Sequence, residues 1–354
     1  MNKKLMSLTL SSAVILNAAS QIPSVYAAEK TDLNQAKDSQ NKNGKNIVYL
    51  ADGEGTQGTG NGTKENPYQN VRTALANVAN GGTLKLVGSV NYTTFDVDTD
   101  KAVLPLFINK NITIEGASGK SPLASDADEF ILRAPIQLGA NVTFKNINLE
   151  LVPQITLGKS SKLLGEVIPR SATIFAAGHT LTLDNINTKV GTNPDQDTQR
   201  PYISGGSFRN KGNFGSKSII NIINPNSETQ FSGIYAGDYT EERTLDVEIN
   251  LDGKVLDTKI YTGGLTKPLN GNVDIKLGSK SNVRIFDKAN HKGNVNVTLQ
   301  ENTYTDNLSF ENVNNLTLEE NAKAILKYNT PFNVNNVTLK NGSIIDFRKV
   351  SGNP

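Results

Sequence analysis

Three aspartates at alternate positions are the residues of this chain best suited to bind a metal ion. Asp96, Asp98 and Asp100 are each separated by one residue, so an extended backbone would place their carboxylates on the same side of the chain. Carboxylate oxygens are ligands that Ca²⁺ takes in proteins, and Asp126–Glu129 offers a second acidic segment. The pattern suggests a Ca²⁺ site. A solvated acidic loop is the simpler interpretation and stays open beside it.

Catalysis at such a site would be that of a calcium-dependent polysaccharide lyase, in which a basic side chain abstracts a proton. Arg133 and Arg170 are the candidate bases, but no sequence pattern places either of them beside the acidic residues. A glycoside hydrolase would instead need two carboxylic acids about 5–9.5 Å apart, and the chain contains no Asp-Asp pair to suggest them. No catalytic residue is assigned, and enzymatic activity is left open with the non-enzymatic interpretation favoured.

The composition excludes several other kinds of site. The chain has no cysteine and only two histidines, His179 and His291. Disulfide scaffolds, zinc fingers and thiol enzymes are therefore excluded, and a Ser/His/Asp relay would depend on one of two residues. His179 stands between Gly178 and a strand-like segment, which is typical of a turn residue. Ca²⁺ is the only cofactor that the sequence suggests.

Tyr235, Tyr239 and Tyr261 are the candidate ligand-binding residues. They lie in a glycine-rich part of the chain, and a tyrosine ring offers an apolar face and a polar tip that suit a sugar ring. Because the Ile-Tyr-x-Gly sequence recurs, the tyrosine can equally be a packing residue at the end of a repeating unit. Both interpretations stay open.

Residues 1–27 have the pattern of a secretory signal peptide, with Lys3 and Lys4 ahead of a short apolar stretch and a small-residue cleavage site at Val25-Tyr26-Ala27. Residues 28–45 have few apolar side chains, which predicts a disordered leader.

The chain has 36 basic and 34 acidic residues, so loss of the two lysines in the signal peptide leaves equal numbers. We expect a secreted or cell-surface protein with no nucleic-acid partner and no transmembrane segment.

A short motif recurs in the rest of the chain, in which asparagine precedes an aliphatic, a polar and an aliphatic or aromatic residue. Its copies are Asn111–Ile114, Asn141–Phe144, Asn272–Ile275, Asn294–Val297, Asn315–Leu318 and Asn336–Leu339, with Thr180–Leu183 as a variant. The last four copies start 22, 21 and 21 residues apart. Alternation gives each strand one inward face, and stacking one copy per coil would bury that face.

This period predicts an all-β fold, a parallel β-helix that forms one domain over residues 46–350. The 44 asparagines suit the bends because asparagine tolerates positive φ, and they can hydrogen-bond from coil to coil as a ladder. The alternative is an array of β-sandwiches, whose strands would recur about every 8–12 residues. The wider spacing of the motif disfavours that alternative.

One helix is expected near the start of this domain. Residues 46–50 favour a strand, and Asn66 is the expected N-cap with Pro67 in the first helical position. Val71, Leu75 and Val78 form a single apolar stripe, and glycines at 81 and 82 are expected to end the helix before a strand at 83–87. One such helix cannot bury its stripe alone, so it should cap the end of a sheet.

These residues also resemble a known family. The segments Val48–Gly53, Glu65–Tyr68 and Gly81–Leu86, with the glycine-rich loop and the helix between them, look like the N-terminal cap of pectin-lyase-like proteins from surfaces of Gram-positive bacteria. The later segments Tyr202–Gly206, Ile234–Asp238, Ile260–Gly264, Gly271–Ile275 and Gly293–Val297 are similar to their coils. The resemblance implies a right-handed parallel β-helix with one N-terminal capping helix. It leaves function open, because that fold hosts enzymes and binding proteins.

The sequence therefore favours a secreted or cell-surface, adhesin-like protein that is not an enzyme. Its expected partner is a polysaccharide or a host or cell-surface protein, and nothing in the sequence predicts its oligomeric state. Two alternatives stay open: a calcium-dependent polysaccharide lyase or other carbohydrate-active enzyme, and a structural spacer without a specific ligand.

Overall fold

The structure of the chain is a computed structural model that describes most residues from 44 to 347. The described ranges are 44–53, 60–92, 105–132, 134–151, 173–189, 200–208, 214–227, 229–238, 241–253, 255, 258–287, 291–326 and 331–347. The predicted signal peptide and nearly all of the predicted leader lie outside these ranges. Lys45, which the sequence assigns to the leader, begins the first strand.

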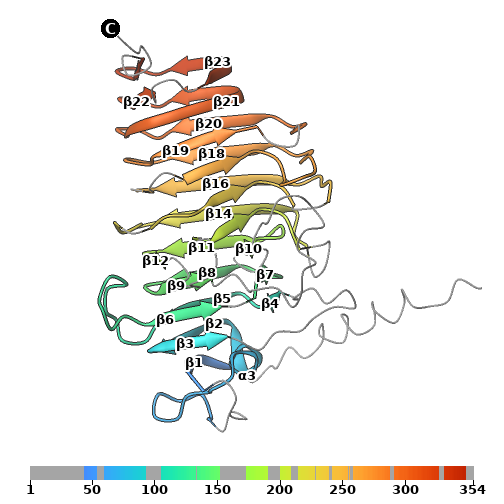
Figure 1. Cartoon of the computed structure of the whole chain (residues 1–354), viewed down its shortest axis with the longest axis vertical. Coiled ribbons are helices and arrows are strands. Elements are labelled where there is room, and N and C mark those ends of the chain that lie inside the picture. Colours follow the sequence, from blue (N-terminus) through green and yellow to red (C-terminus); the bar gives the residue numbers. More distant parts are fainter. Residues whose placement is uncertain are drawn as a thin grey trace, which may run out of the picture. The chain divides into compact units, whose positions relative to one another are not determined.

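Parallel strands stacked one per coil form the first face of the molecule (Figure 1). Each strand pairs with the equivalent strand of the next coil. The strands of this face are β1 (Lys45–Ala51), β2 (Val78–Val87), β5 (Ile112–Gly116), β8 (Val142–Lys145), β11 (Thr180–Asp184), β14 (Lys217–Ile223), β16 (Asp246–Asp252), β18 (Val273–Leu277), β20 (Val295–Leu299), β21 (Tyr304–Leu318) and β23 (Phe332–Leu339).

Shorter strands complete each coil. A second face consists of β4 (Leu106–Ile108), β7 (Ile136–Leu138), β10 (Thr173–Phe175), β13 (Tyr202–Ser204), β15 (Gly233–Tyr235), β17 (Thr258–Tyr261) and β19 (Val283–Phe286). A separate sheet consists of β3 (Ser89–Tyr92), β6 (Glu129–Leu132), β9 (Asn148–Leu151) and β12 (Asn187–Lys189). In the last coils, β22 (Lys323–Leu326) pairs with β21, and β24 (Ile344–Asp346) pairs with β22.

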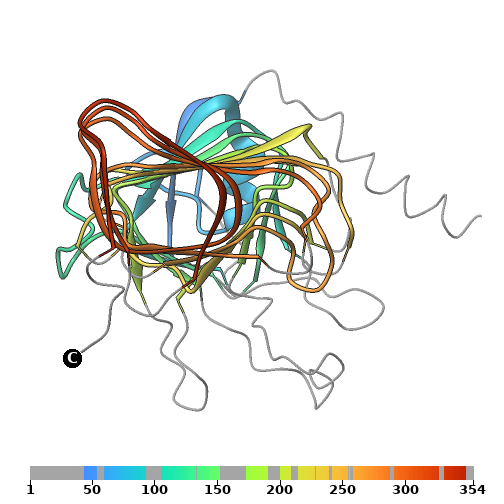
Figure 2. The same ribbon diagram turned by 90° about the horizontal axis from the view of Figure 1, so that it is seen from above.

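Seen along the stack, the coils superpose as rings around one interior (Figure 2). The all-β, right-handed parallel β-helix expected from the sequence is thus confirmed, and the aliphatic and aromatic residues of every copy of the recurring motif lie in a strand of the first face. The outer limits of the predicted domain, residues 46–350, stay a prediction.

The register between two of the motif copies differs from the sequence prediction. Asn315 stands over Asn296 rather than over Asn294, so the coil between them is two residues shorter than the motif spacing suggests. A shift of two residues leaves every side chain on its original face of the sheet. The alternation alone therefore cannot distinguish the two registers, and the turn lengths decide between them.

Aliphatic side chains fill the interior in columns, one residue from each coil. Leu251, Leu277, Leu299 and Leu318 follow one another in register, and each is at most 1% exposed. Burial of a leucine side chain contributes about 1.5–3 kcal/mol. Because each coil adds a similar set of inward residues, the stack itself provides the hydrophobic core.

The single helix among the described residues is α3 (Val71–Asn77), and it begins later than predicted. Its N-cap is Asn70, whose side chain accepts a hydrogen bond from Thr73 N at 3.0 Å. Tyr68 is instead held in a parallel bridge with Leu50, which keeps the segment ahead of Asn70 extended.

The glycines at 81 and 82 lie within β2 rather than at the helix end. Val71 and Ala74 are buried, so α3 packs against the first coil as expected.

Asparagine ladders join the turns of successive coils, as the composition predicts. Asn146, Asn185 and Asn224 each follow a first-face strand with φ of 51°, 47° and 47°, in the left-handed region that asparagine tolerates best after glycine. Asn185 Nδ2 donates to Asn146 Oδ1 at 2.9 Å. The same residue type therefore provides both the bend and the contact between coils.

Candidate functional site

An aromatic column lies on the outer side of the second face. Strand register places Phe175, Ser204, Tyr235, Tyr261 and Phe286 in line, one per coil. Residues point alternately inward and outward along each strand, and an isoleucine of the interior core precedes every residue of the column. The column is therefore external to the core, and Phe175, Tyr235 and Tyr261 belong to a separate hydrophobic cluster.

The tyrosine rings stack along this column. The ring centroids of Tyr235 and Tyr261 are 4.6 Å apart with planes inclined by 14°, and those of Tyr261 and Phe286 are 5.7 Å apart at 27°. Tyr202, from the neighbouring position of β13, lies 6.2 Å from Tyr235. Such offset arrangements contribute about 0.5–1.5 kcal/mol per pair beyond the buried area.

Gly233 makes room for two of these rings. A Cβ atom at this position would lie 3.5 Å from Tyr202 Cε1, an ordinary contact, and 3.2 Å from Tyr261 Cε2, which would require a small shift of the Tyr261 ring. Burial raises the pKa of the Tyr202 hydroxyl, and a hydrogen bond with Ser232 only partly opposes this. Tyr202 therefore stays protonated at neutral pH.

The structure brings together two of the three predicted tyrosines. Tyr235 is 4% exposed, whereas Tyr261 and Phe286 are partly exposed, so ligand could reach the column at these last two residues. Tyr239 lies outside the described residues. A ligand-binding role for these tyrosines stays a prediction.

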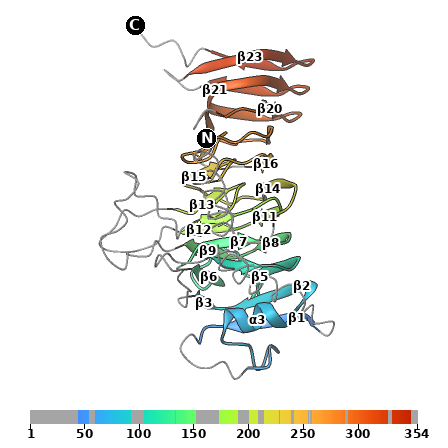
Figure 3. The same ribbon diagram turned by 90° about the vertical axis from the view of Figure 1, so that its right-hand side faces the viewer.

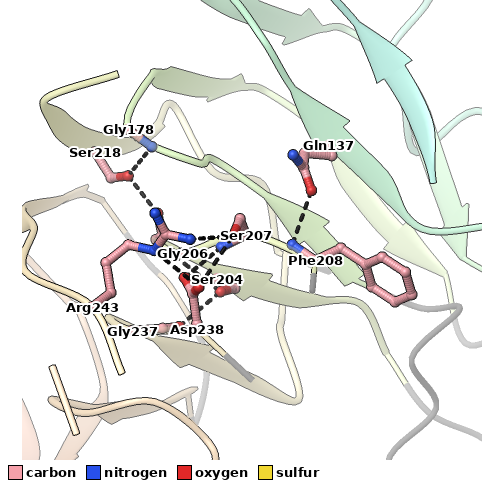
Figure 4. A network of polar contacts seen from close by, with 11 residues as sticks. Gln137, Gly178, Ser204, Gly206, Ser207, Phe208, Ser218, Gly237, Asp238 and Arg243 are labelled. Carbon is pink, nitrogen blue, oxygen red and sulfur yellow. Dashed lines mark hydrogen bonds and ion pairs between the residues drawn. The ribbon is translucent and has the colours of Figure 1, made fainter. Parts of the chain in front are cut away.

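A buried ion pair lies beside the column, between two coils (Figure 4). Arg243 Nε donates to Asp238 Oδ2 at 3.0 Å, and the side chains are 18% and 0% exposed. Ser207 contributes its backbone N–H to Asp238 Oδ1 at 2.6 Å and its hydroxyl to Oδ2 at 3.1 Å. Arg243 also donates to Ser207 Oγ at 2.9 Å, and its guanidinium lies 4.4 Å from the ring centre of Phe214.

Burial raises the pKa of Asp238, while Arg243 and the two Ser207 donors act in the opposite direction. Gly206 allows this arrangement, because a Cβ atom there would overlap Asp238 Oδ1. Every described interaction of the carboxylate is with a fixed protein donor. The network therefore fixes the turns after β13 and β15 and supports the column; its geometry is that of a structural contact.

Other buried polar side chains do the same for neighbouring turns. Ser204 Oγ donates to Gly237 O at 2.9 Å, Gln137 Oε1 accepts from Phe208 N at 2.9 Å, and Ser218 Oγ accepts from Gly178 N at 2.7 Å. None of these residues was predicted from the sequence. A polar residue directly after the glycine of the Ile-x-x-Gly sequence, as in Ser207 and Asp238, is the signal that could have pointed to the network.

The acidic segment at residues 126–129 holds turns of its own coil and of the preceding one. Asp126 forms an exposed ion pair with Lys120, and this contact lowers its pKa. Asp128 is buried and accepts hydrogen bonds from Gly88 N, Ser118 N and Ser118 Oγ at 2.9, 2.7 and 2.6 Å. Glu129 accepts from Ser89 Oγ at 2.9 Å. These carboxylates have protein donors as partners.

The predicted Ca²⁺ ligands Asp96, Asp98 and Asp100 lie outside the described residues, as do the candidate bases Arg133 and Arg170. In the part of the chain that the structure does describe, no three acidic or histidine side chains are grouped to hold a metal ion. His179 lies in the turn before β11, and its backbone N–H donates to Ala176 O at 2.9 Å, the place expected for a turn residue.

The chain has no match among protein-family models, curated proteins or solved structures. The resemblance to pectin-lyase-like proteins therefore stays a prediction from the residues quoted above, and the structure supports only the parallel β-helix. No helix within the described ranges has the length and apolar character needed to cross a membrane.

Proposed function

We propose that this protein is an extracellular, adhesin-like β-helix protein that binds a glycan and catalyses no reaction. The finer relation to pectin-lyase-like surface proteins of Gram-positive bacteria is part of the proposal. The observation that carries it is the aromatic column on the second face, with the stacked and partly exposed rings of Tyr261 and Phe286. Stacking covers the ring faces within the column, so its exposed side presents ring edges and tyrosine hydroxyls. The edges can pack against the apolar parts of a sugar, and the hydroxyls can hydrogen-bond to sugar hydroxyls.

Support for a rigid site comes from the residues around the column. The Asp238–Arg243 pair fixes the turns beside Tyr235, and Gly233 allows the rings to approach. A preorganised surface loses little side-chain freedom when it binds. Extracellular location rests on the signal-peptide pattern at residues 1–27. A host or cell-surface protein remains the second kind of ligand that such a face would fit.

The proposal is tested by binding of the secreted chain to an array of neutral and acidic glycans, with Ca²⁺ and with a chelator. We expect saturable binding that does not depend on Ca²⁺ and leaves no unsaturated sugar product. Tyr261→Leu should weaken binding about tenfold, since it removes one stacking ring, while Tyr261→Phe should retain most of it.

Tyr304 provides the matched control, since it is 47% exposed and lies in β21 away from the column. Tyr304→Leu should bind as the parent chain does. Release of an unsaturated product in the presence of Ca²⁺ would support the lyase alternative. If no glycan bound saturably, or if both leucine variants bound equally well, the aromatic column would lose its proposed role.

A further inference from the structure

The strands of the second face carry charge at only two positions. Within the described residues of this face, the charged side chains are those of Lys259 and Arg284. Both are basic, and the pairing of β17 with β19 places them directly opposite each other. Neighbouring strands lie about 4.8 Å apart, so a single anionic group can contact both side chains.

These two basic residues share the outer side of the face with the exposed rings. The isoleucine between Lys259 and Tyr261 is fully buried, as is the isoleucine between Arg284 and Phe286. Side chains alternate along a strand, so the residues on either side of each isoleucine point outward. All four are partly exposed. Positions two apart on a strand are about 6.6 Å apart, so one substituted sugar can reach both a ring and a charge.

Charges on the first face are arranged differently. Basic and acidic residues alternate there from coil to coil, in the register Lys85, Glu115, Lys145 and Asp184. Lys85 forms an ion pair with Glu115, and Lys145 forms one with Asp184. Opposite charges at such positions stabilise the pairing of strands, whereas like charges directly opposite each other destabilise it. The basic pair on the second face is of the unfavourable kind.

Where like charges do meet on the first face, opposite charges lie beside them. Glu248 stands opposite Asp274, and its carboxylate lies 2.6 Å from Lys217 and 2.8 Å from Lys276. Lys259 differs, because no acidic side chain among the described residues forms an ion pair with it. An anionic ligand would supply the opposite charge at this place.

We propose that Lys259 and Arg284 bind a sulfate or phosphate monoester of the glycan that contacts Tyr261 and Phe286. This inference rests on the proposed glycan-binding function and names the class of glycan. Such an ester has three terminal oxygens. The guanidinium of Arg284 donates to two of them through its planar fork, and the ammonium of Lys259 donates to the third. A carboxylate has two oxygens, so the two residues would have to share one of them.

Glu311 limits where the ester can lie. It follows Phe310, which is buried and pairs with Ile285, so the next outward position beyond Phe286 carries a partly exposed carboxylate. That carboxylate repels an anion. The ester therefore lies beside Lys259 on the strands β17 and β19, and the uncharged part of the sugar lies against the rings.

The test uses the full chain and four polymers with one backbone: dextran, dextran sulfate, dextran phosphate and carboxymethyl dextran, the last three at equal substitution. Surface plasmon resonance measures the affinity for each. We expect at least one of the two esters to bind about tenfold more tightly than carboxymethyl dextran, and the comparison of the two distinguishes sulfate from phosphate. Lys259→Gln and Arg284→Gln should each weaken ester binding about tenfold, and added salt should weaken it too.

Lys64→Gln is the matched control. Lys64 is an exposed residue ahead of α3, and α3 lies at the opposite end of the stack from β20, the strand that follows β19 (Figure 3). This variant should bind the esters as the parent does, and circular dichroism reports the folding of each variant. Equal losses for Lys64→Gln and Lys259→Gln would overturn the proposal, since the binding would then be non-specific.

Carboxymethyl dextran binding as tightly as both esters would also overturn it. If that result came with saturable binding of another glycan that Tyr261→Leu weakens, the proposed glycan-binding function would stand and only the ester site would fail. If no glycan and no dextran derivative bound saturably, both proposals would fail together.

Discussion

Glu248 shows how single charged residues contribute to contact between coils. Its carboxylate lies between Lys217 of the preceding coil, at 2.6 Å, and Lys276 of the following coil, at 2.8 Å. These two contacts, first that with Lys217, lower the pKa of Glu248 to about 2 from an ordinary value of 4.5. One residue thus links three strands of the first face.

This shift predicts a pH dependence of stability. Because the pKa is lower in the folded chain than in the unfolded chain, ionised Glu248 stabilises the fold above about pH 4.5, and that contribution is lost as pH falls towards about 2. Glu248→Gln should therefore lower the free energy of unfolding at pH 7 and have a much smaller effect near pH 2. Denaturant unfolding of both proteins at several pH values measures the difference.

Lys217→Met should also lower the free energy of unfolding more at pH 7 than near pH 2. The difference should be smaller than for Glu248→Gln, because Lys217 is the main but not the only partner of the carboxylate. A constant difference between parent and Glu248→Gln from pH 7 to pH 2 would contradict the assignment of the lowered pKa to Glu248.

At the scale of elements, turns determine which strands meet and in what register. The first-face strands are similar in sequence, yet Asn315 pairs with Asn296 and not with Asn294. The left-handed asparagines after β8, β11 and β14 end these strands at equivalent places. Their side chains then hydrogen-bond from coil to coil, so that each turn helps to position the next.

Substitution of Asn185 separates the two roles of such a residue. Its φ of 47° costs an ordinary residue about 1–2 kcal/mol, and its ladder hydrogen bond contributes about 1 kcal/mol. Asn185→Ala should therefore lower the free energy of unfolding by about 2 kcal/mol. Asn185→Gly should lower it by about 1 kcal/mol, because glycine loses only the hydrogen bond.

Denaturant unfolding gives both values, with Asn335→Ala as control. Asn335 is an exposed residue of β23, and its substitution should change stability by less than about 0.5 kcal/mol. If Asn185→Gly were as destabilising as Asn185→Ala, the backbone conformation would not be the deciding factor.

For the molecule as a whole, position along the stack determines how much a core residue contributes. Leu277 and Leu339 occupy one interior column, but Leu277 is fully buried between two coils and Leu339 is 53% exposed on the last one. The same side chain therefore has two neighbouring coils in the first case and one in the second.

Leucine-to-alanine substitution along this column should show that gradient. Leu277→Ala leaves a cavity between coils and should lower the free energy of unfolding by about 2–5 kcal/mol. Leu339→Ala should lower it by less than about 1 kcal/mol, since its site can already reach solvent. Thermal or denaturant unfolding provides the comparison. Equal losses for the two variants would mean that the last coil is covered in solution.

The candidate site was only partly predictable from sequence. The Ile-Tyr-x-Gly repeat pointed to Tyr235 and Tyr261, and the structure stacks these two rings. The sequence held no comparable signal for Arg243, because its contact with Ser207 joins segments on different coils. Loop lengths between coils vary, so such neighbours cannot be counted from the spacing of the motif.

The sequence by itself determined the β-helix, because its two signals are local: alternation that gives each strand an inward face, and asparagines that accept the left-handed bend. Only the tertiary structure decided which residues meet. It set the two-residue register shift at Asn296, and it moved the helix start to Asn70 by pairing Tyr68 with Leu50. These outcomes depend on contacts between distant segments, and the free energy of those contacts outweighs local preference wherever the two compete.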